Sequence, residues 1–118
     1  MDPTHFFETA VPYFICRGLT AFLSSRGTIQ FSIEGAGAWT VQLGNLDAPI
    51  SRGLVGTADL AVWYSSRAFD SFLDGTMNPK EVIRAGEFIA SGDLRLLEQL
   101  GRVLAAPKGG LGIRVGLA

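Results

Sequence analysis

The sequence has few of the side chains that build catalytic and metal sites. It contains one histidine, His5, and one cysteine, Cys16, among 118 residues. A lone cysteine forms no intramolecular disulfide, which fits a reducing compartment. A single imidazole cannot supply a histidine-based zinc site, and His5 lies too near the N-terminus to be a favourable base for a serine–histidine–aspartate triad. We therefore predict no catalytic residue, no metal and no cofactor.

Charge is also scarce and nearly balanced. Ten basic and eleven acidic residues give a net charge of −1, and charged residues make up 18% of the chain. This lack of a basic excess argues against a nucleic-acid partner, which calls for a basic face. Residues 77–118 nevertheless contain six basic and four acidic residues. That local excess leaves a transient contact with an anionic membrane surface open.

Long apolar runs are absent. The longest, such as Ala10–Cys16, fall far short of the roughly 20 residues that span a bilayer. No basic stretch precedes an apolar run and a small-residue cleavage site, so no secretory signal is recognised. The sequence predicts a soluble, cytoplasmic protein.

Hydrophobic residues, by contrast, are abundant. They make up 47% of the chain and include eight Phe and two Trp. A chain of this length forms one domain with a core that needs no disulfide or metal. The apolar excess fits a large core, a dimer interface or an internal ligand cavity, and composition does not choose among the three.

The first half of the chain predicts helices followed by strands. Asp2-Pro3 is a helix start, and Pro12 and Gly18 indicate two short helices or one kinked helix ending near Ser25. Apolar and polar residues then alternate over 28–34 and 39–43 around the turn at 35–37, which predicts a hairpin. A weak strand is expected at 50–54 and another at 59–64. Trp63 departs from the alternation and is expected to point outward.

The second half is mostly helical. Ser65-Ser66 caps a helix that carries Phe69, Phe72 and Leu73 and ends at Gly75. Asn78-Pro79 starts a short helix that closes at Gly86, and residues 87–91 form a last strand. Gly92-Asp93 then begins a leucine-rich helix. Residues 107–118 form a C-terminal tail. Strands and helices segregated in this way predict a single α+β domain with a mostly antiparallel sheet.

Three stretches of the chain, Gly56–Val62, Phe69–Pro79 and Gly86–Asp93, resemble the sterol carrier protein-2 (SCP-2) domain. In that family an Ala-Asp pair opens a strand, and a helix ends in Gly before a helix started by Pro. A later strand closes in Gly-Asp before a leucine-rich helix. The resemblance covers about residues 3–105. It departs at Val82-Ile83-Arg84-Ala85 and at Glu87, which change the rim of the family's site.

The resemblance implies a five-stranded twisted sheet covered by four to five helices, with an apolar tunnel between the layers. It also implies a lipid carrier that binds sterols, fatty acids, acyl-CoA, isoprenoids or phospholipids, without catalysis. Some relatives are modules of larger enzymes or accessories of quinone synthesis. Ligand identity does not follow, because of the departures at the rim.

A cavity of this kind favours an occupant. Pockets for small ligands measure about 300–1,000 Å³, and empty apolar cavities cost on the order of 24 cal/mol per Å³. The product approaches or exceeds the roughly 5–15 kcal/mol by which a domain is stable. Either a lipid fills the space or the helices partly collapse over it.

We predict that the lining comes from the inner face of the sheet and from the helices that cover it. Lys80 and Arg84 near the mouth are candidates to meet a carboxylate or phosphate headgroup. The predicted lipid-binding residues are Trp39, Phe69, Phe72, Leu73, Met77, Val82, Ile83, Phe88, Leu97, Leu100 and Leu104.

Two alternatives remain open. The same fold with a filled core could be an interaction or accessory module that dimerises or docks on a partner enzyme, through Trp63 and the apolar tail. An enzyme acting on a bound lipid would need a buried polar group, and Asp59, Tyr64, Arg84 and Glu87 are the candidates. A structural hydrogen bond to nearby backbone is the simpler role for Asp59. The sequence leaves monomer and homodimer undecided.

Overall fold

The N-terminal quarter of the chain is helical, as predicted. The computed structural model describes residues 2–105. The helices at this end are α1 (Pro3–His5), the π-helical turn η1 (Phe6–Ala10), α2 (Val11–Arg17) and α3 (Leu19–Leu23). Asp2 caps the first turn by accepting a 2.8 Å hydrogen bond from the backbone N–H of His5.

The π-helical turn was not predicted, and Pro12 explains it. Proline has no N–H to donate to the carbonyl four residues earlier, and its ring crowds that carbonyl, which here belongs to Glu8. A helix relieves such a conflict by a kink or by a local widening. The widened turn places both Phe6 and Phe7 in the core, where they are 1% and 0% exposed.

Five strands form one sheet, as the resemblance implied. They are β1 (Gly27–Ile33), β2 (Gly37–Leu43), β3 (Ile50–Arg52), β4 (Leu60–Tyr64) and β5 (Phe88–Gly92). Their order is β3-β2-β1-β4-β5. All neighbouring pairs are antiparallel except β1 and β4, which are parallel. The prediction of a mostly antiparallel sheet is confirmed.

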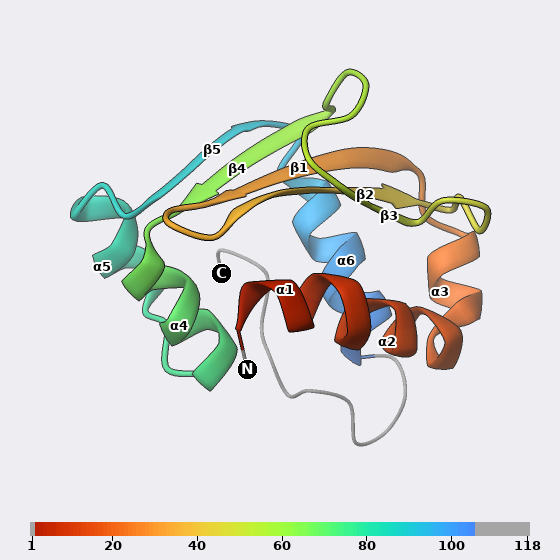
Figure 1. The fold of residues 1–118 in the computed structure, drawn as a ribbon, viewed down its shortest axis with the longest axis horizontal. Helices are drawn as coiled ribbons and strands as arrows, with labels where there is room; N and C mark the ends of the chain where they lie inside the picture. The colour runs from red at the N-terminus through yellow and green to blue at the C-terminus, as the bar shows by residue number, and fades with distance from the viewer. Residues whose placement is uncertain (1, 106–118) are drawn as a thin grey trace.

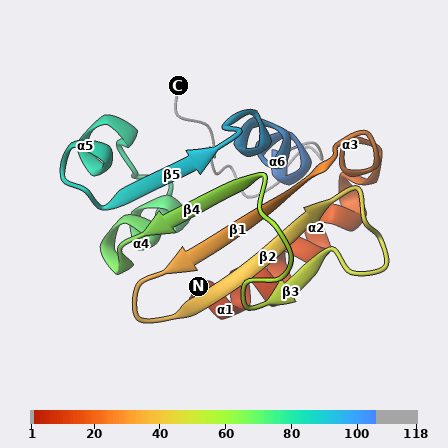
Figure 2. The same cartoon turned by 90° about the horizontal axis from the view of Figure 1, so that it is seen from above.

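The parallel pair requires a crossover, and the chain makes it over the outer face of the sheet. The segment 53–59 leaves the edge strand β3 and passes in front of β2 and β1 to reach β4 (Figure 2). Side chains of the outer face hold it there. Thr40 donates to the carbonyl of Gly53 at 2.7 Å, and Gln30 donates to the carbonyl of Gly56 at 3.1 Å. Thr40 is therefore buried although it points away from the helices.

The three remaining helices lie where the sequence predicted them, although α5 ends before Gly86 and α6 begins after Asp93. They are α4 (Ser66–Asp74), α5 (Pro79–Arg84) and α6 (Arg95–Ala105). The side chains of Ser65 and Asn78 cap α4 and α5, and Gly75 closes α4 with a φ of 74°. At the last helix, Asp93 Oδ1 accepts a hydrogen bond of 3.1 Å from the N–H of Arg95.

The sheet and the helices form two layers. Figure 1 shows α1, α2, α3, α4 and α6 below the sheet, with α5 at one end beside the start of β5. Strand residues that point toward the helices are apolar and buried, as in Ile29, Phe31 and Ile33 of β1. The core lies between the two layers, and the α+β prediction is confirmed.

Candidate functional site

Aromatic rings fill the space below the β1, β2 and β4 strands. Phe7 stacks on Trp39 with ring centroids 4.9 Å apart, and it lies 5.7 Å from Phe69. Phe72 lies 5.4 Å from Phe69 and 5.6 Å from Phe6. These are ordinary contact distances for aromatic pairs. Three predicted lining residues, Trp39, Phe69 and Phe72, therefore lie in a packed aromatic cluster.

The leucines of α6 also lie in the core. Leu97, Leu100 and Leu104 are 1–2% exposed. They belong to the apolar face of α6, which packs against the N-terminal helices α2 and α3. Their burial agrees with the leucine-rich apolar face that the sequence predicted for this helix. Other side chains separate them from solvent.

An apolar groove opens where β5 forms the edge of the sheet. It has a volume of about 350 Å³ and lies between α5, β5 and the residue before α6. We call it the edge groove. Its lining residues are Ile83, Gly86, Phe88, Ile89, Ala90 and Leu94.

Among residues 2–105, the edge groove is lined by apolar side chains and one glycine. Ile83, Ile89 and Leu94 are 47%, 58% and 44% exposed, whereas Phe88 at its base is 4% exposed. The predicted lining residues Ile83 and Phe88 are thus brought together there. Exposed branched side chains around an apolar base are the arrangement that a site for an apolar ligand or partner requires.

The sequence predictions did not include Ile89, Ala90 and Leu94 as lining residues. Ile89 points to the outer face of the sheet, as its pairing with Trp63 shows. Leu94 continues the leucine pattern of α6, but it precedes the helix and faces solvent. The usable signal was position: Ile89 and Ala90 belong to β5 and Leu94 follows it, and β5 is the edge strand of the sheet formed by residues 2–105.

The predicted residues Leu73, Met77 and Val82 lie on α4, between α4 and α5, and on α5. Leu73 and Met77 are half-buried and pack against the core. Val82 is buried and lines a second hollow of about 320 Å³ between α4 and α5. We call this the polar hollow. Its lining residues are Arg67, Ala68, Ser71, Thr76, Asn78, Glu81, Val82, Ala85 and Glu87.

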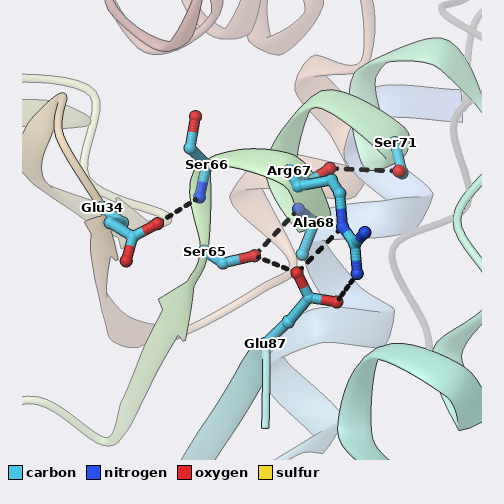
Figure 3. A network of polar contacts seen from close by, with 7 residues as sticks. All are labelled: Glu34, Ser65, Ser66, Arg67, Ala68, Ser71 and Glu87. Atoms are coloured by element: carbon cyan, nitrogen blue, oxygen red, sulfur yellow. Dashed lines mark hydrogen bonds and ion pairs between the residues drawn. The ribbon is translucent and has the colours of Figure 1, made fainter. Parts of the chain in front are cut away.

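An ion pair organises the polar hollow (Figure 3). Arg67 donates to Glu87 through Nε at 3.1 Å and through Nη2 at 2.7 Å. Ser65 donates to the same carboxylate at 3.2 Å and caps α4 by accepting from the N–H of Ala68. The hydrogen bonds from Arg67 lower the pKa of Glu87, which keeps the carboxylate charged and engaged. Glu87 therefore connects β5 to α4.

Two other candidates for lipid chemistry have structural partners. Asp59 Oδ2 accepts a 2.8 Å hydrogen bond from the N–H of Thr28, which confirms its predicted structural role. Tyr64 is 1% exposed, and burial raises the pKa of its phenol well above the ordinary value. Its hydroxyl is thus uncharged at neutral pH. Neither group is arranged as a general base.

Lys80 and Arg84 lie one turn apart on α5, and both are exposed. Helical geometry places Lys80 next to Ile83 on the surface of α5, since residues three apart are neighbours. Glu81, Val82 and Ala85 face the polar hollow. The cationic side of α5 therefore borders the edge groove, while its acidic side borders the polar hollow.

The described residues were also compared with the requirements of a metal site and of a membrane-spanning helix. Residues 2–105 contain no group of three or more His, Cys, Asp and Glu side chains placed to hold a metal ion. Every helix within that range is too short or too polar to cross a bilayer. The predicted tail, residues 107–118, lies outside the described residues.

Comparison with known proteins supports the resemblance seen in the sequence. The solution structure of the sterol carrier protein domain 2 of Helicoverpa armigera has a TM-score of 0.64 at 15% identity, covering 85% of this chain and 87% of that one. That of palmitated SCP2L2 from Aedes aegypti has a TM-score of 0.65 at 19% identity, covering 85% and 91%. The ubiquinone synthesis protein UbiJ-SCP2 has a TM-score of 0.60 at 12% identity, covering 85% and 90%.

At these identities the solved structures establish the fold. Among curated protein sequences, none matches this chain at a significant level. The family itself is identified by sequence. Residues 18–105, from the end of α2 to the end of α6, match the SCP-2 sterol transfer family, and the chain belongs to that family.

Proposed function

We propose that this protein binds one apolar lipid at the edge groove and carries or presents it, without catalysis. The groove is the observation that supports the proposal most directly. It is lined by apolar side chains and Gly86, it is open to solvent, and Ile83 and Phe88 from the predicted site lie in it. Membership of a family of lipid transfer proteins gives the class of ligand.

The position of the ligand follows from packing. The middle of the core is occupied by aromatic rings at contact distance, so a guest would have to displace side chains there. The edge groove needs no such displacement. We infer that the lipid enters under β5 and lies against Phe88. The buried α6 residues Leu97, Leu100 and Leu104 would be reached only by an outward shift of the surrounding side chains.

Apolar burial supplies enough free energy for binding. Each buried methylene contributes about 0.8 kcal/mol, so eight methylenes offer roughly 6 kcal/mol before the loss of ligand freedom. The groove volume of about 350 Å³ lies at the lower end of ligand sites. Since its lining among residues 2–105 is apolar, the groove would select for apolar shape rather than for a particular chemical group. Broad selectivity among fatty acids, acyl-CoA, isoprenoids, sterols and phospholipids is expected.

The headgroup of the lipid would remain outside the groove. Lys80 and Arg84 lie on α5 beside Ile83 and are exposed. A carboxylate or a phosphate at the mouth would meet these charges, as the sequence predicted. Exposed ion pairs of this kind contribute about 0–1 kcal/mol each, so they would orient the ligand more than they would hold it.

The structural relatives are consistent with a carrier. One of them, from Aedes aegypti, is described as palmitated, which is consistent with a fatty acyl ligand for the present protein. Another is described as a ubiquinone synthesis protein. An accessory role beside an enzyme of lipid or quinone metabolism is therefore our second candidate. We place either role in the cytoplasm, because a single cysteine fits a reducing compartment.

Absence of catalysis is part of the proposal. Glu87 is held by Arg67, Asp59 is held by the backbone of Thr28, and the phenol of Tyr64 is buried with a raised pKa. Arg84, the remaining candidate, is an exposed cation. A catalytic acid or base would need a free group with a pKa suited to its task, next to the bound lipid.

The test is lipid uptake by the full chain. Native mass spectrometry of the purified protein should detect a bound lipid, and a fluorescent fatty acid should bind in one-to-one stoichiometry and raise the melting temperature. Decanol or an unlabelled fatty acid should compete, whereas a short carboxylate such as acetate should not. The proposal is overturned if no apolar ligand binds or stabilises the protein at saturating concentration.

A further inference from the structure

The outer edge of β5 presents backbone groups that no described strand uses. β5 is the last strand of the sheet. On its inner edge, the carbonyl of Glu87 accepts from Ser65 N at 2.8 Å and the N–H of Asp93 donates to Asp59 at 2.9 Å. Hydrogen-bonding direction alternates along an antiparallel strand. The N–H and C=O groups of Phe88, Ala90 and Gly92 therefore point to the open edge.

This edge lacks the protection that sheet edges usually have. Natural sheets blunt an edge with a short strand, a charge, a proline or a bulge. The opposite edge of this sheet follows that rule, because β3 has three residues, carries Arg52 and follows Pro49. β5 has five residues, Phe-Ile-Ala-Ser-Gly, with no charge and no proline. Within residues 2–105, β5 therefore forms the sheet edge that is better suited to receive another strand.

We propose that β5 pairs with β5 of a second copy of this chain, about a two-fold axis near Ala90. An antiparallel pair centred there sets Ala90 opposite Ala90 of the second copy, and Phe88 opposite Gly92. The open N–H and C=O groups of each strand then bond to those of the other. The two sheets become one continuous sheet across the interface. This inference depends on the edge and not on lipid binding.

The apolar residues beside the edge fit such a pair. Ile83 lies near the start of β5 and Leu94 follows its end, and both are exposed. Antiparallel pairing brings the start of one strand next to the end of the other. Ile83 of one copy therefore approaches Leu94 of the second copy, and the same contact repeats on the other side of the axis. Each edge groove is then completed by a side chain from the other copy.

The charges at the two ends of β5 are also complementary. Lys80 and Arg84 on α5 have no carboxylate partner within the described part of the chain. At the other end, Asp93 is neutralised by Arg95 at 3.0 Å, while Glu98 is exposed one turn after Leu94. A two-fold pair sets the cationic α5 of one copy toward Glu98 of the other. A parallel or head-to-tail contact would not match both ends in this way.

The test measures the oligomeric state of the full chain. Sedimentation velocity from micromolar to submillimolar concentration should show a dimer. Ile89→Lys places a charge on the edge strand and should raise the dimer Kd at least about tenfold. Leu46→Lys is the matched control, because Leu46 is similarly exposed at 54% but lies in the loop between β2 and β3. It should leave the dimer intact.

A charge exchange tests the arrangement itself. Arg84→Glu and Glu98→Arg should each weaken the dimer, and the double variant should regain it, because opposite charges then face each other again. The proposal is overturned if the full chain is monomeric. This holds if residues 106–118 are found to cover the edge, and it holds if the edge is found to bind anionic vesicles instead. A dimer that is unaffected by Ile89→Lys overturns it as well. Fatty acid uptake by Glu98→Arg, whose residue lies outside the edge groove lining, shows separately whether the carrier function holds.

Discussion

The backbone N–H of Asp93 donates a 2.9 Å hydrogen bond to the carbonyl of Asp59, which joins the two most distinctive pieces of the sequence resemblance. Asp59 also binds Thr28 twice, through Oδ2 at 2.8 Å and through its own N–H at 2.9 Å. One aspartate thus connects the ends of β1, β4 and β5. The Ala-Asp and Gly-Asp motifs therefore have a structural role in joining these three strands.

Gly92 is the residue that permits this connection. Its φ is 120°, and a Cβ there would overlap the carbonyl oxygen of Asp59. Gly92→Ala should therefore destabilise the protein by clearly more than the roughly 1–3 kcal/mol that an unfavourable backbone conformation costs by itself. Gly37→Ala is the matched control, because Gly37 has a similar φ of 128° and its Cβ position meets only the ring of Trp39, at an ordinary contact distance of 3.9 Å.

Urea unfolding of the two variants measures the difference. The control should lose about 1–3 kcal/mol, from backbone strain alone. If both glycine variants lose the same free energy of unfolding, then the close approach of Gly92 to Asp59 contributes nothing, and this interpretation of the Gly-Asp motif is wrong.

Phe7 is the centre of the aromatic cluster. It is fully buried and lies within 5.7 Å, centroid to centroid, of Trp39, Phe31, Phe6 and Phe69. Phe7→Ala should cost about 3–5 kcal/mol, the usual loss for a phenylalanine removed from a core. Tyr13→Ala, at a residue of the adjoining helix that is 53% exposed, should cost less than about 0.5 kcal/mol. Thermal unfolding followed by circular dichroism compares them, and a small loss for Phe7→Ala would show that the cluster is loosely packed.

Local patterns predicted most of the fold, because the signals were local. The caps at Ser65 and Asn78, the stop at Gly75 and the alternation in β1 and β2 depend on neighbours in the sequence, and the structure confirms each. The parallel pairing of β1 with β4 is different. It depends on a crossover through residues 53–59, which no periodicity reveals. The π-helical turn was missed for a related reason, since Pro12 indicated a kink but not its form.

The site was harder to predict than the fold. A buried leucine of the core and a leucine beside a ligand look alike in sequence, so Leu97 and Leu100 were grouped with Ile83 and Phe88. What separates them is exposure, which depends on where β5 ends the sheet. Ile89 is 58% exposed because its side chain points to the outer face of the sheet, away from the helices below. The tunnel implied by the resemblance stays a prediction.

Acid should destabilise the protein through Glu8 in particular. Glu8 accepts a 2.8 Å hydrogen bond from the indole of Trp39 and pairs with Arg52, and these contacts lower its pKa from an ordinary 4.5. Arg95 likewise lowers the pKa of Asp93, and Arg67 that of Glu87. A carboxylate with a lowered pKa stabilises the fold above its unfolded pKa, and this stabilisation is lost as the pH falls through the folded pKa.

The measurement is the urea midpoint between neutral pH and pH 3. The urea midpoint of the wild type should be constant near neutral pH and should fall below about pH 4.5. Glu8→Gln should be less stable than the wild type at neutral pH and should lose less on acidification, because one of the contributing carboxylates is gone. Parallel curves for the two proteins would mean that Glu8 gives no pH-dependent stabilisation.

Ala90 tests whether the lipid lies in the edge groove. It lies on the inner face of β5, lines the edge groove and is half-buried. Ala90→Leu adds methylene-sized groups to the groove while leaving the backbone edge unchanged. Loss of space for two ligand methylenes, at about 0.8 kcal/mol each, should weaken fatty acid binding about tenfold or more.

Ala61→Leu is the control for this variant. Ala61 belongs to β4 and is exposed on the outer face, opposite Ser91, so the same side-chain change adds the same apolar surface outside the edge groove. Titration with a fluorescent fatty acid should therefore show normal affinity for Ala61→Leu and reduced affinity for Ala90→Leu. Equal affinities would place the lipid elsewhere in the fold. Since the two alanines differ mainly in the face of the sheet that they occupy, a selective loss in Ala90→Leu assigns the ligand to the side of β5 that faces the helices.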